Sequence, residues 1–173
     1  MIAGSETKID AYERLLALLD ANGAQYRLID HPAEGRTEIV SAMRGHPVRL
    51  AAKCIIVMVK LGKKVTKFVL AVIPGDARVD LDVIRSLKRG TYAGFAPPDR
   101  AEELAGSVVG TVLPFALDPR LELIVDPAIA DSDELFFNAG RLDRSIGLKT
   151  ADYVRLARPR FERIAKVSQE NET

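Results

Sequence analysis

The order of apolar and polar side chains predicts several helices. Residues 8–22 carry apolar side chains at helical spacing. Thr7 and Asp10 are suited to begin this helix in the manner of a capping box, and Gly23 is suited to end it. Further helices are predicted at 38–43 after Thr37 as N-cap, at 81–88 between Asp80 as N-cap and Gly90, at 98–105 between Pro97 and Gly106, and at 150–157, which Thr150 opens.

Continuous apolar runs and alternating patterns predict the strands. Residues 53–60 and 67–73 are apolar on both faces, as is typical of central strands, and Gly62 between them favours a hairpin. Shorter strands are predicted at 25–30, 121–126, 134–139 and 145–149, and a turn at 74–80.

Strands interleaved with short helices predict a fold of the α/β (α+β) class, with short helices around a mixed central sheet. One domain is expected over residues 1–173, because 173 residues fit a single core. Its core is expected at about 8–157, and the polar tail at 158–173 is expected to fray at its end.

Charge and composition exclude several classes of protein. Lys and Arg number 25 against 24 Asp and Glu, so a net charge of +1 gives no general attraction to nucleic acid or membranes. A polyanionic partner must therefore meet a local patch. The N-terminus lacks the pattern of a signal peptide, and the apolar runs are too short to span a membrane, so a soluble, cytoplasmic protein is expected.

The usual catalytic and cofactor motifs do not occur in the sequence. Cys54 is the single cysteine, which excludes an internal disulfide, and its apolar neighbours predict a buried, small hydrophobic residue. His31, His46 and Cys54 are scattered without the spacing of metal ligands, so no metal and no cofactor are expected. The GxSxG, GxxxxGK[ST] and GxGxxG motifs are also missing.

Lys53 is the first candidate for chemistry, because it stands at the start of the apolar run 53–60. A lysine in this setting either extends its ammonium group to solvent or binds an anion. The alternative is a strand-end lysine on the solvent face. The lysines around the hairpin turn are expected to be solvated, although together they could meet a phosphate backbone; they are Lys60, Lys63, Lys64 and Lys67.

Gly106, Gly110 and Pro114 recur at intervals of four residues. Glycine lets the main chain approach a ligand and direct N–H groups at a carbonyl oxygen or an oxyanion. The alternative is a helix C-cap at Gly106 followed by a strand with a glycine bulge at Gly110.

Three polar residues near strand ends are candidates for ligand contacts. Asn138 ends a predicted strand, and Ser145 follows Gly140 by five residues. Asn138 could equally satisfy its own backbone in a turn. His31, before Pro32, either lines a pocket or caps backbone groups.

The order of these motifs resembles the YbaK family of aminoacyl-tRNA deacylases, which includes the insertion domain of prolyl-tRNA synthetases. The resemblance covers about residues 8–157. It rests on His31, Thr37, "AAKCIIV" with Lys53, "LAVIPGDARVDLDVIRSL", "GSVVGTVLPF", "FNAGRLDRSIGL" and the closing "TADYVRL".

The resemblance implies a trans-editing hydrolase that cleaves the ester joining a wrongly attached small amino acid to the 3′ end of a tRNA. Lys53 matches the family's lysine, which engages the substrate near the tRNA terminus. Gly106 and Gly110 match the glycine-rich loop that faces the aminoacyl carbonyl, with Gly110 as the catalytic partner of Lys53. The remaining substrate-binding candidates are His31, Thr37, Asn138 and Ser145, the last where relatives often carry an aspartate.

The partner implied is the acceptor end of a mischarged tRNA, with a synthetase or an elongation factor as possible suppliers of further contacts. An activated ester needs only a polarised carbonyl and a held water, so the lack of a triad or a metal is compatible with this chemistry. Two alternatives stay open: a non-catalytic module that binds tRNA or a synthetase, and a Schiff-base enzyme with Lys53 as nucleophile.

Overall fold

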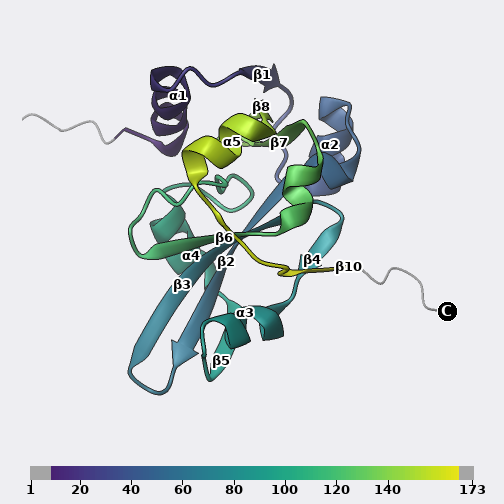
Figure 1. Ribbon diagram of the computed structural model, residues 1–173. Coiled ribbons are helices and arrows are strands. Elements are labelled where there is room, and N and C mark those ends of the chain that lie inside the picture. Colours follow the sequence, from purple (N-terminus) through teal and green to yellow (C-terminus); the bar gives the residue numbers. More distant parts are fainter. Residues whose placement is uncertain (1–8, 168–173) are drawn as a thin grey trace, which may run out of the picture.

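The computed structural model describes residues 9–167, which fold around a mixed five-stranded sheet (Figure 1). The strand order is β5–β2–β3–β6–β9, formed by Tyr92–Phe95, Ala52–Leu61, Val65–Pro74, Leu121–Val125 and Arg160–Phe161. A three-stranded antiparallel sheet has the order β1–β8–β7, formed by Tyr26–Asp30, Arg144–Lys149 and Glu134–Asn138. A third, two-stranded sheet pairs β4, Ala77–Val79, with β10, Ala165–Val167. The predicted α/β class with a mixed sheet is confirmed.

The β2–β3 hairpin is the centre of this fold. Its antiparallel register runs from Ala52 opposite Pro74 to Leu61 opposite Val65, and Gly62 in the turn has φ +71°. Alternate residues of both strands enter two different hydrophobic clusters, one on each face of the sheet. Burial on both faces is why these strands read as continuous apolar runs.

The two clusters separate the helices into two groups. The first cluster is larger and packs one face of the sheet against α1, α4, α5 and strands β7 and β8; the helices are Ala11–Ala21, Pro98–Ala105 and Thr150–Ala157. The second cluster packs the other face against α3, Leu81–Leu87, and Ile164. Figure 1 shows α1, α2 and α5 at one end of the molecule and α3 with β5 at the other.

Several helix ends agree with the sequence predictions. Asp10 caps α1 by accepting from Glu13 N at 2.8 Å, and Asp80 caps α3 by accepting from Asp82 N. Gly106 ends α4 with φ +70°. Thr7 lies outside the described residues.

Two predicted caps are wrong. Helix α2, Thr37–Arg44, begins at Thr37 itself, and the N-cap position is held by Arg36 without a side-chain hydrogen bond. Helix α3 ends before Gly90, because Arg89 adopts the left-handed turn with φ +53°. Gly90 is needed for space instead, since an added Cβ would lie 2.5 Å from Val59 Cγ1.

Four further differences concern strands. Strand β5 was not predicted, and residues 77–79 form β4 within the predicted turn. The predicted strand with a bulge at Gly110 is wrong, because residues 106–120 form no strand. The tail contributes β9 and β10, and residues 168–173 lie outside the described part.

Within residues 9–167, no helix has the length and apolar character needed to cross a membrane.

Candidate active site

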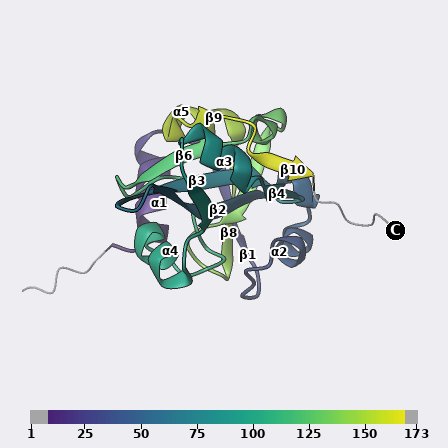
Figure 2. The ribbon, with the colours of Figure 1, turned by 90° about the horizontal axis from the view of Figure 1, so that it is seen from below.

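A small cavity of about 190 Å³ lies where α2, the start of β2, the loop after α4 and the end of β7 meet. Figure 2 shows α2 and α4 on either side of β1 and β8. The cavity is lined by Gly35, Thr37, Val40, Arg44, Ala51, Ala52, Lys53, Cys54, Ile55, Gly110, Val112, Phe137 and Asn138.

Four of the residues selected from the sequence meet at this cavity: Lys53, Gly110, Thr37 and Asn138. They come from four separate stretches of chain, which only the tertiary fold brings together. Gly106 does not line the cavity. A Cβ added to it would have no heavy atom within 4 Å, and its φ of +70° is explained by its place at the end of α4.

The edge of β2 beside the cavity has no strand partner among the described residues. Strand β5 pairs with β2 only from Val57 to Lys60, and an isolated bridge joins Ala51 to Phe136. Between these two points the carbonyl oxygen of Ile56 accepts from Ala96 N at 3.0 Å, so the part of this edge left open to a ligand lies at residues 53–55. Lys53 lies in this interval, half-buried, and its Nζ donates a hydrogen bond of 3.3 Å to the carbonyl oxygen of Ala77.

Arg44, which the sequence analysis did not select, forms the charged wall of the cavity. Its Nε donates to Ser145 Oγ at 2.7 Å and its Nη2 to Asn138 Oδ1 at 2.9 Å. No carboxylate of residues 9–167 forms an ion pair with it, and burial lowers the pKa of Arg44 to about 10. A guanidinium kept among neutral partners is a strong donor for an electron-rich ligand.

The third nitrogen of Arg44 has the weakest protein partner. Nη1 lies 3.5 Å from Nε2 of His46. His46 Nδ1 is 2.8 Å from the carbonyl oxygen of Pro47, so Nδ1 carries the proton and Nε2 presents a lone pair to Arg44. Burial, then the charge of Arg44, lowers the pKa of His46, and its ring stacks on Phe136 at 3.9 Å. Arg44 therefore retains donor capacity at the cavity.

Ser145 and His31 lie behind the cavity wall rather than on it. Ser145 is fully buried and accepts from Arg44. Its hydroxyl lies 2.7 Å from Nε2 of His31 and 2.9 Å from Oδ1 of Asn138. His31 Nδ1 is 2.8 Å from the carbonyl oxygen of Pro32. This geometry gives both residues a role in positioning Arg44.

Asn138 joins the two loops that border the cavity. Its Nδ2 donates to the carbonyl oxygens of Glu34 and Gly110, each at 2.9 Å, while Oδ1 accepts from Arg44 and Ser145. All of its hydrogen-bonding groups are thus occupied, and the side chain is only 6% exposed. The alternative of a turn residue that satisfies its own backbone is wrong.

Gly110 approaches the loop of Gly35 closely enough to require glycine. A Cβ on Gly110 would lie 3.0 Å from the Cα of Gly35, and φ is +88°. Its carbonyl accepts from Asn138, whereas its N–H has no hydrogen-bond partner among residues 9–167. A main-chain N–H at the wall of a cavity can polarise a carbonyl oxygen.

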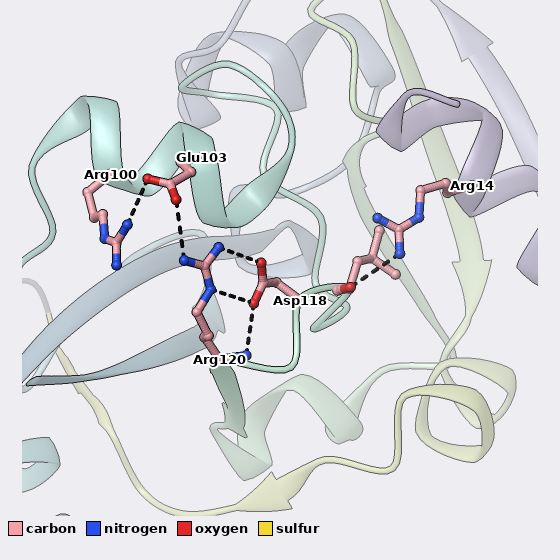
Figure 3. A network of polar contacts seen from close by, with 6 residues as sticks. Arg14, Arg100, Glu103, Asp118 and Arg120 are labelled. Atoms are coloured by element: carbon pink, nitrogen blue, oxygen red, sulfur yellow. Dashed lines mark hydrogen bonds and ion pairs between the residues drawn. The ribbon is translucent and has the colours of Figure 1, made fainter. Parts of the chain in front are cut away.

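An ion network anchors the far end of the loop that carries Gly110 (Figure 3). Arg120 contacts Asp118 at 2.8 Å and Glu103 at 3.3 Å, which links the end of the loop to α4. Arg120 lowers the pKa of Asp118 to about 2. Arg14 of α1 also donates to the carbonyl oxygen of Leu117 at 3.2 Å. The far end of a loop without regular structure is thereby fixed to α4 and α1.

The remaining chemistry of the site is limited. Within residues 9–167 no group of three or more His, Cys, Asp or Glu side chains could hold a metal ion. Burial raises the pKa of the Cys54 thiol, which disfavours the nucleophilic thiolate. The cavity is lined by a cation at its edge, a half-buried guanidinium, and Gly110, whose N–H has no hydrogen-bond partner among residues 9–167.

Comparison with known sequences gives two matches over most of the chain. The family model for the aminoacyl-tRNA editing domain matches residues 31–156. The "Multifunctional Ser/Thr-tRNA deacylase ProXp-y" of Escherichia coli is 42% identical over 160 residues, which cover 92% of this chain and 93% of that protein.

Comparison with solved structures shows the same fold. A crystal structure of a hypothetical protein has a TM-score of 0.79 at 22% identity and covers 89% of this chain and 100% of its own. A candidate trans-editing enzyme for prolyl tRNA synthetase has a TM-score of 0.74 at 20% identity, covering 90% of this chain and 97% of its own. At these identities the likeness concerns the fold alone.

Proposed function

The chain belongs to the aminoacyl-tRNA editing domain family, and we propose that its cavity hydrolyses the ester of tRNA mischarged with a small, hydroxyl-bearing amino acid. As a member of this family the protein is an aminoacyl-tRNA deacylase, an ester hydrolase that acts on mischarged tRNA. The amino acid and the role of each residue are the proposal. The observation that carries it is the meeting of Lys53, Gly110 and Arg44 at one cavity.

The size of the cavity favours a small amino acid. Its 190 Å³ equals about six water molecules at about 30 Å³ each. Such a space takes the ester group and a side chain of a few heavy atoms, whereas a large aromatic side chain would collide with Phe137 or Val40. Steric exclusion of larger amino acids discriminates more strongly than a difference in apolar contact, because one methylene group alone changes the binding free energy by only about 1–3 kcal/mol.

The hydrolysis needs no protein nucleophile. An aminoacyl ester is activated, so a polarised carbonyl and a positioned water suffice. We assign the N–H of Gly110 to the carbonyl oxygen, where it stabilises the negative charge that develops as water adds. Lys53 holds the tRNA terminus at the open edge of β2, so that the ester enters the cavity in one orientation.

Arg44 supplies selectivity for a hydroxyl group. Its Nη1 has only the 3.5 Å contact to His46, so it can donate to the side-chain oxygen of a seryl or threonyl ester. A site built to bind a hydroxyl group discriminates strongly against a substrate that lacks it, because the buried donor is then left without a partner. The name of the Escherichia coli relative, a Ser/Thr-tRNA deacylase, supports this choice.

The test is a deacylation screen with seryl, threonyl, alanyl, cysteinyl and prolyl esters on several tRNAs. We expect the seryl and threonyl esters to be cleaved fastest, and Lys53→Ala to abolish their cleavage without loss of the fold. Lys60→Ala is the matched control, because Lys60 lies on the same strand, is exposed, and has its ammonium group 5.7 Å from the centre of the Tyr92 ring, away from the cavity lining.

Wild-type turnover by Lys53→Ala would refute the role of Lys53. If the whole panel of esters stayed intact while tRNA bound tightly, the alternative of a non-catalytic binding module would replace the proposal. Addition of a synthetase or an elongation factor to the same assay tests whether either partner raises the rate.

A further inference from the structure

A second hollow, a groove of about 660 Å³, adjoins the small cavity across the open edge of β2. Lys53 and Ile55 line both spaces, so the groove and the cavity share a border. The other residues that line the groove come from β4, α3, β5 and β10: Arg78, Val79, Leu81, Asp82, Ala93, Phe95 and Lys166. The mechanism proposed above uses none of these other residues.

Two like charges lie side by side at this groove. Arg78 of β4 and Lys166 of β10 are direct cross-strand partners in an antiparallel pair, and both are exposed. Like charges in this arrangement repel and destabilise the strand pair. Neither forms an ion pair with a carboxylate of residues 9–167, and Asp82, the one acidic residue of the groove, lies 3.8 Å from Arg85. An anion bound between Arg78 and Lys166 would relieve the repulsion.

An exposed aromatic ring completes the groove. Phe95 is 61% exposed at the end of β5, so its ring is accessible to a ligand in the groove. Ile55, Val79 and Ala93 provide an apolar floor beside it. A row of cations next to an exposed aromatic ring is the arrangement that binds single-stranded nucleic acid, with phosphates on the cations and a base stacked on the ring.

We propose that this groove binds the single-stranded 3′ end of the tRNA, with Phe95 stacking on a base and Arg78 with Lys166 holding phosphates. The inference rests on the proposed function, because the bound strand must lead its terminal ester over Lys53 into the small cavity. The net charge of +1 gives the whole molecule little attraction for RNA, so a local cluster of this kind is required.

The first experiment measures binding, independently of catalysis. Fluorescence anisotropy compares a labelled RNA hairpin that ends in a single-stranded ACCA segment with the same hairpin lacking the segment. We expect the wild type to prefer the first probe, and Phe95→Ala to weaken its binding about tenfold. For Arg78→Ala/Lys166→Ala, we expect the slope of log Kd against log salt concentration to fall by about 1.4, or about 0.7 for each of two phosphates.

Matched controls separate the groove from general effects of charge and aromatic area. Lys63→Ala/Lys64→Ala removes the same charge at the hairpin turn, and Tyr92→Ala removes an aromatic ring that is 51% exposed outside the groove. Both controls should bind the ACCA probe as the wild type does. The proposal would be overturned if the controls lost as much affinity for the ACCA probe as the groove variants, or if the groove variants lost none.

The second experiment compares two substrates, seryl-tRNA and the serine ester of adenosine. The groove variants should raise KM for seryl-tRNA and leave hydrolysis of the adenosine ester unchanged. A wild type that cleaves neither ester refutes the proposed function, while the binding experiment still decides on the groove. If the wild type cleaves both esters and the groove variants have the same KM for seryl-tRNA as the wild type, the proposed role of the groove is refuted while the proposed function stands.

Discussion

Replacement of Asn138 by alanine should loosen the whole site, because this side chain joins both loops to Arg44. The substitution removes two hydrogen bonds to the carbonyl oxygens of Glu34 and Gly110, one from Ser145, and one from a charged guanidinium. A neutral hydrogen bond contributes about 1 kcal/mol and one to a charged group about 1.5–3 kcal/mol, so the sum is about 4.5–6 kcal/mol.

Water from the adjacent cavity can reach part of these groups and recover some of this loss. We therefore expect Asn138→Ala to lower the free energy of unfolding by about 3 kcal/mol, which corresponds to a decrease in Tm of about 6–12 °C for a chain of this length. Urea denaturation and calorimetry measure the two quantities. The kcat for seryl-tRNA should fall as well, because the N–H of Gly110 loses its fixed position.

Asn22→Ala provides the matched control. Asn22 is exposed and donates one hydrogen bond of 2.7 Å to the carbonyl oxygen of Leu18, so its loss should cost about 0.5 kcal/mol and no activity. Asn138→Asp separates the acceptor role of this side chain from its donor role. The variant keeps an oxygen that accepts from Arg44, but it replaces the NH₂ group that donates to the carbonyl oxygens of Glu34 and Gly110 with an oxygen that repels them. If Asn138→Ala cost no more than the control and kept wild-type kcat, the reasoning would be refuted.

Three other changes test single features of the site. Gly110→Ala should cost about 1–2 kcal/mol of stability and most of the activity, because φ is +88° and its Cβ would crowd Gly35; Gly62→Ala, with φ +71° and open space, should show the strain alone. Arg44→Met should lower the ratio of kcat/KM for seryl over alanyl esters about tenfold or more, and an unchanged ratio would exclude hydroxyl recognition by Arg44. Because the pKa of His46 is lowered in the folded state, the unfolded chain binds more protons, and stability should fall as the pH drops below about 6.5. In urea titrations between pH 7 and 5, His46→Gln should lose stability less steeply than the wild type; identical slopes would contradict this assignment.

Local sequence patterns were sufficient to predict the central hairpin and several of the helix ends. The hairpin of β2 and β3 could be predicted because both strands are buried on both faces, so their apolar runs are continuous. The N-cap Asp80 and the C-terminal Gly106 could be predicted because caps depend on the chemistry of one or two residues. Strand β5 escaped prediction because it has only four residues and contains Gly94, a residue type that weakens a strand.

The site could be predicted only in part, because its geometry depends on contacts between distant segments. Lys53 and Gly110 were selected with the help of the family resemblance, and the structure places them at one cavity. Arg44 was missed because an arginine in the last turn of a helix normally faces solvent. One signal was available: Val40 and Arg44 are four residues apart, and therefore lie on the same face of α2.

The hydrogen bonds of Asn138 also set the time at which the protein can become active during synthesis. They join residues 104 and 28 positions apart, and the bond between Ser145 and His31 spans 114 positions. Loops of this length close late in folding. On the ribosome, the cavity cannot be assembled before β8 has left the exit tunnel, when most of the chain has been made. Deacylation is thus a direct reporter of completed folding, and nascent chains that end before β8 should be inactive.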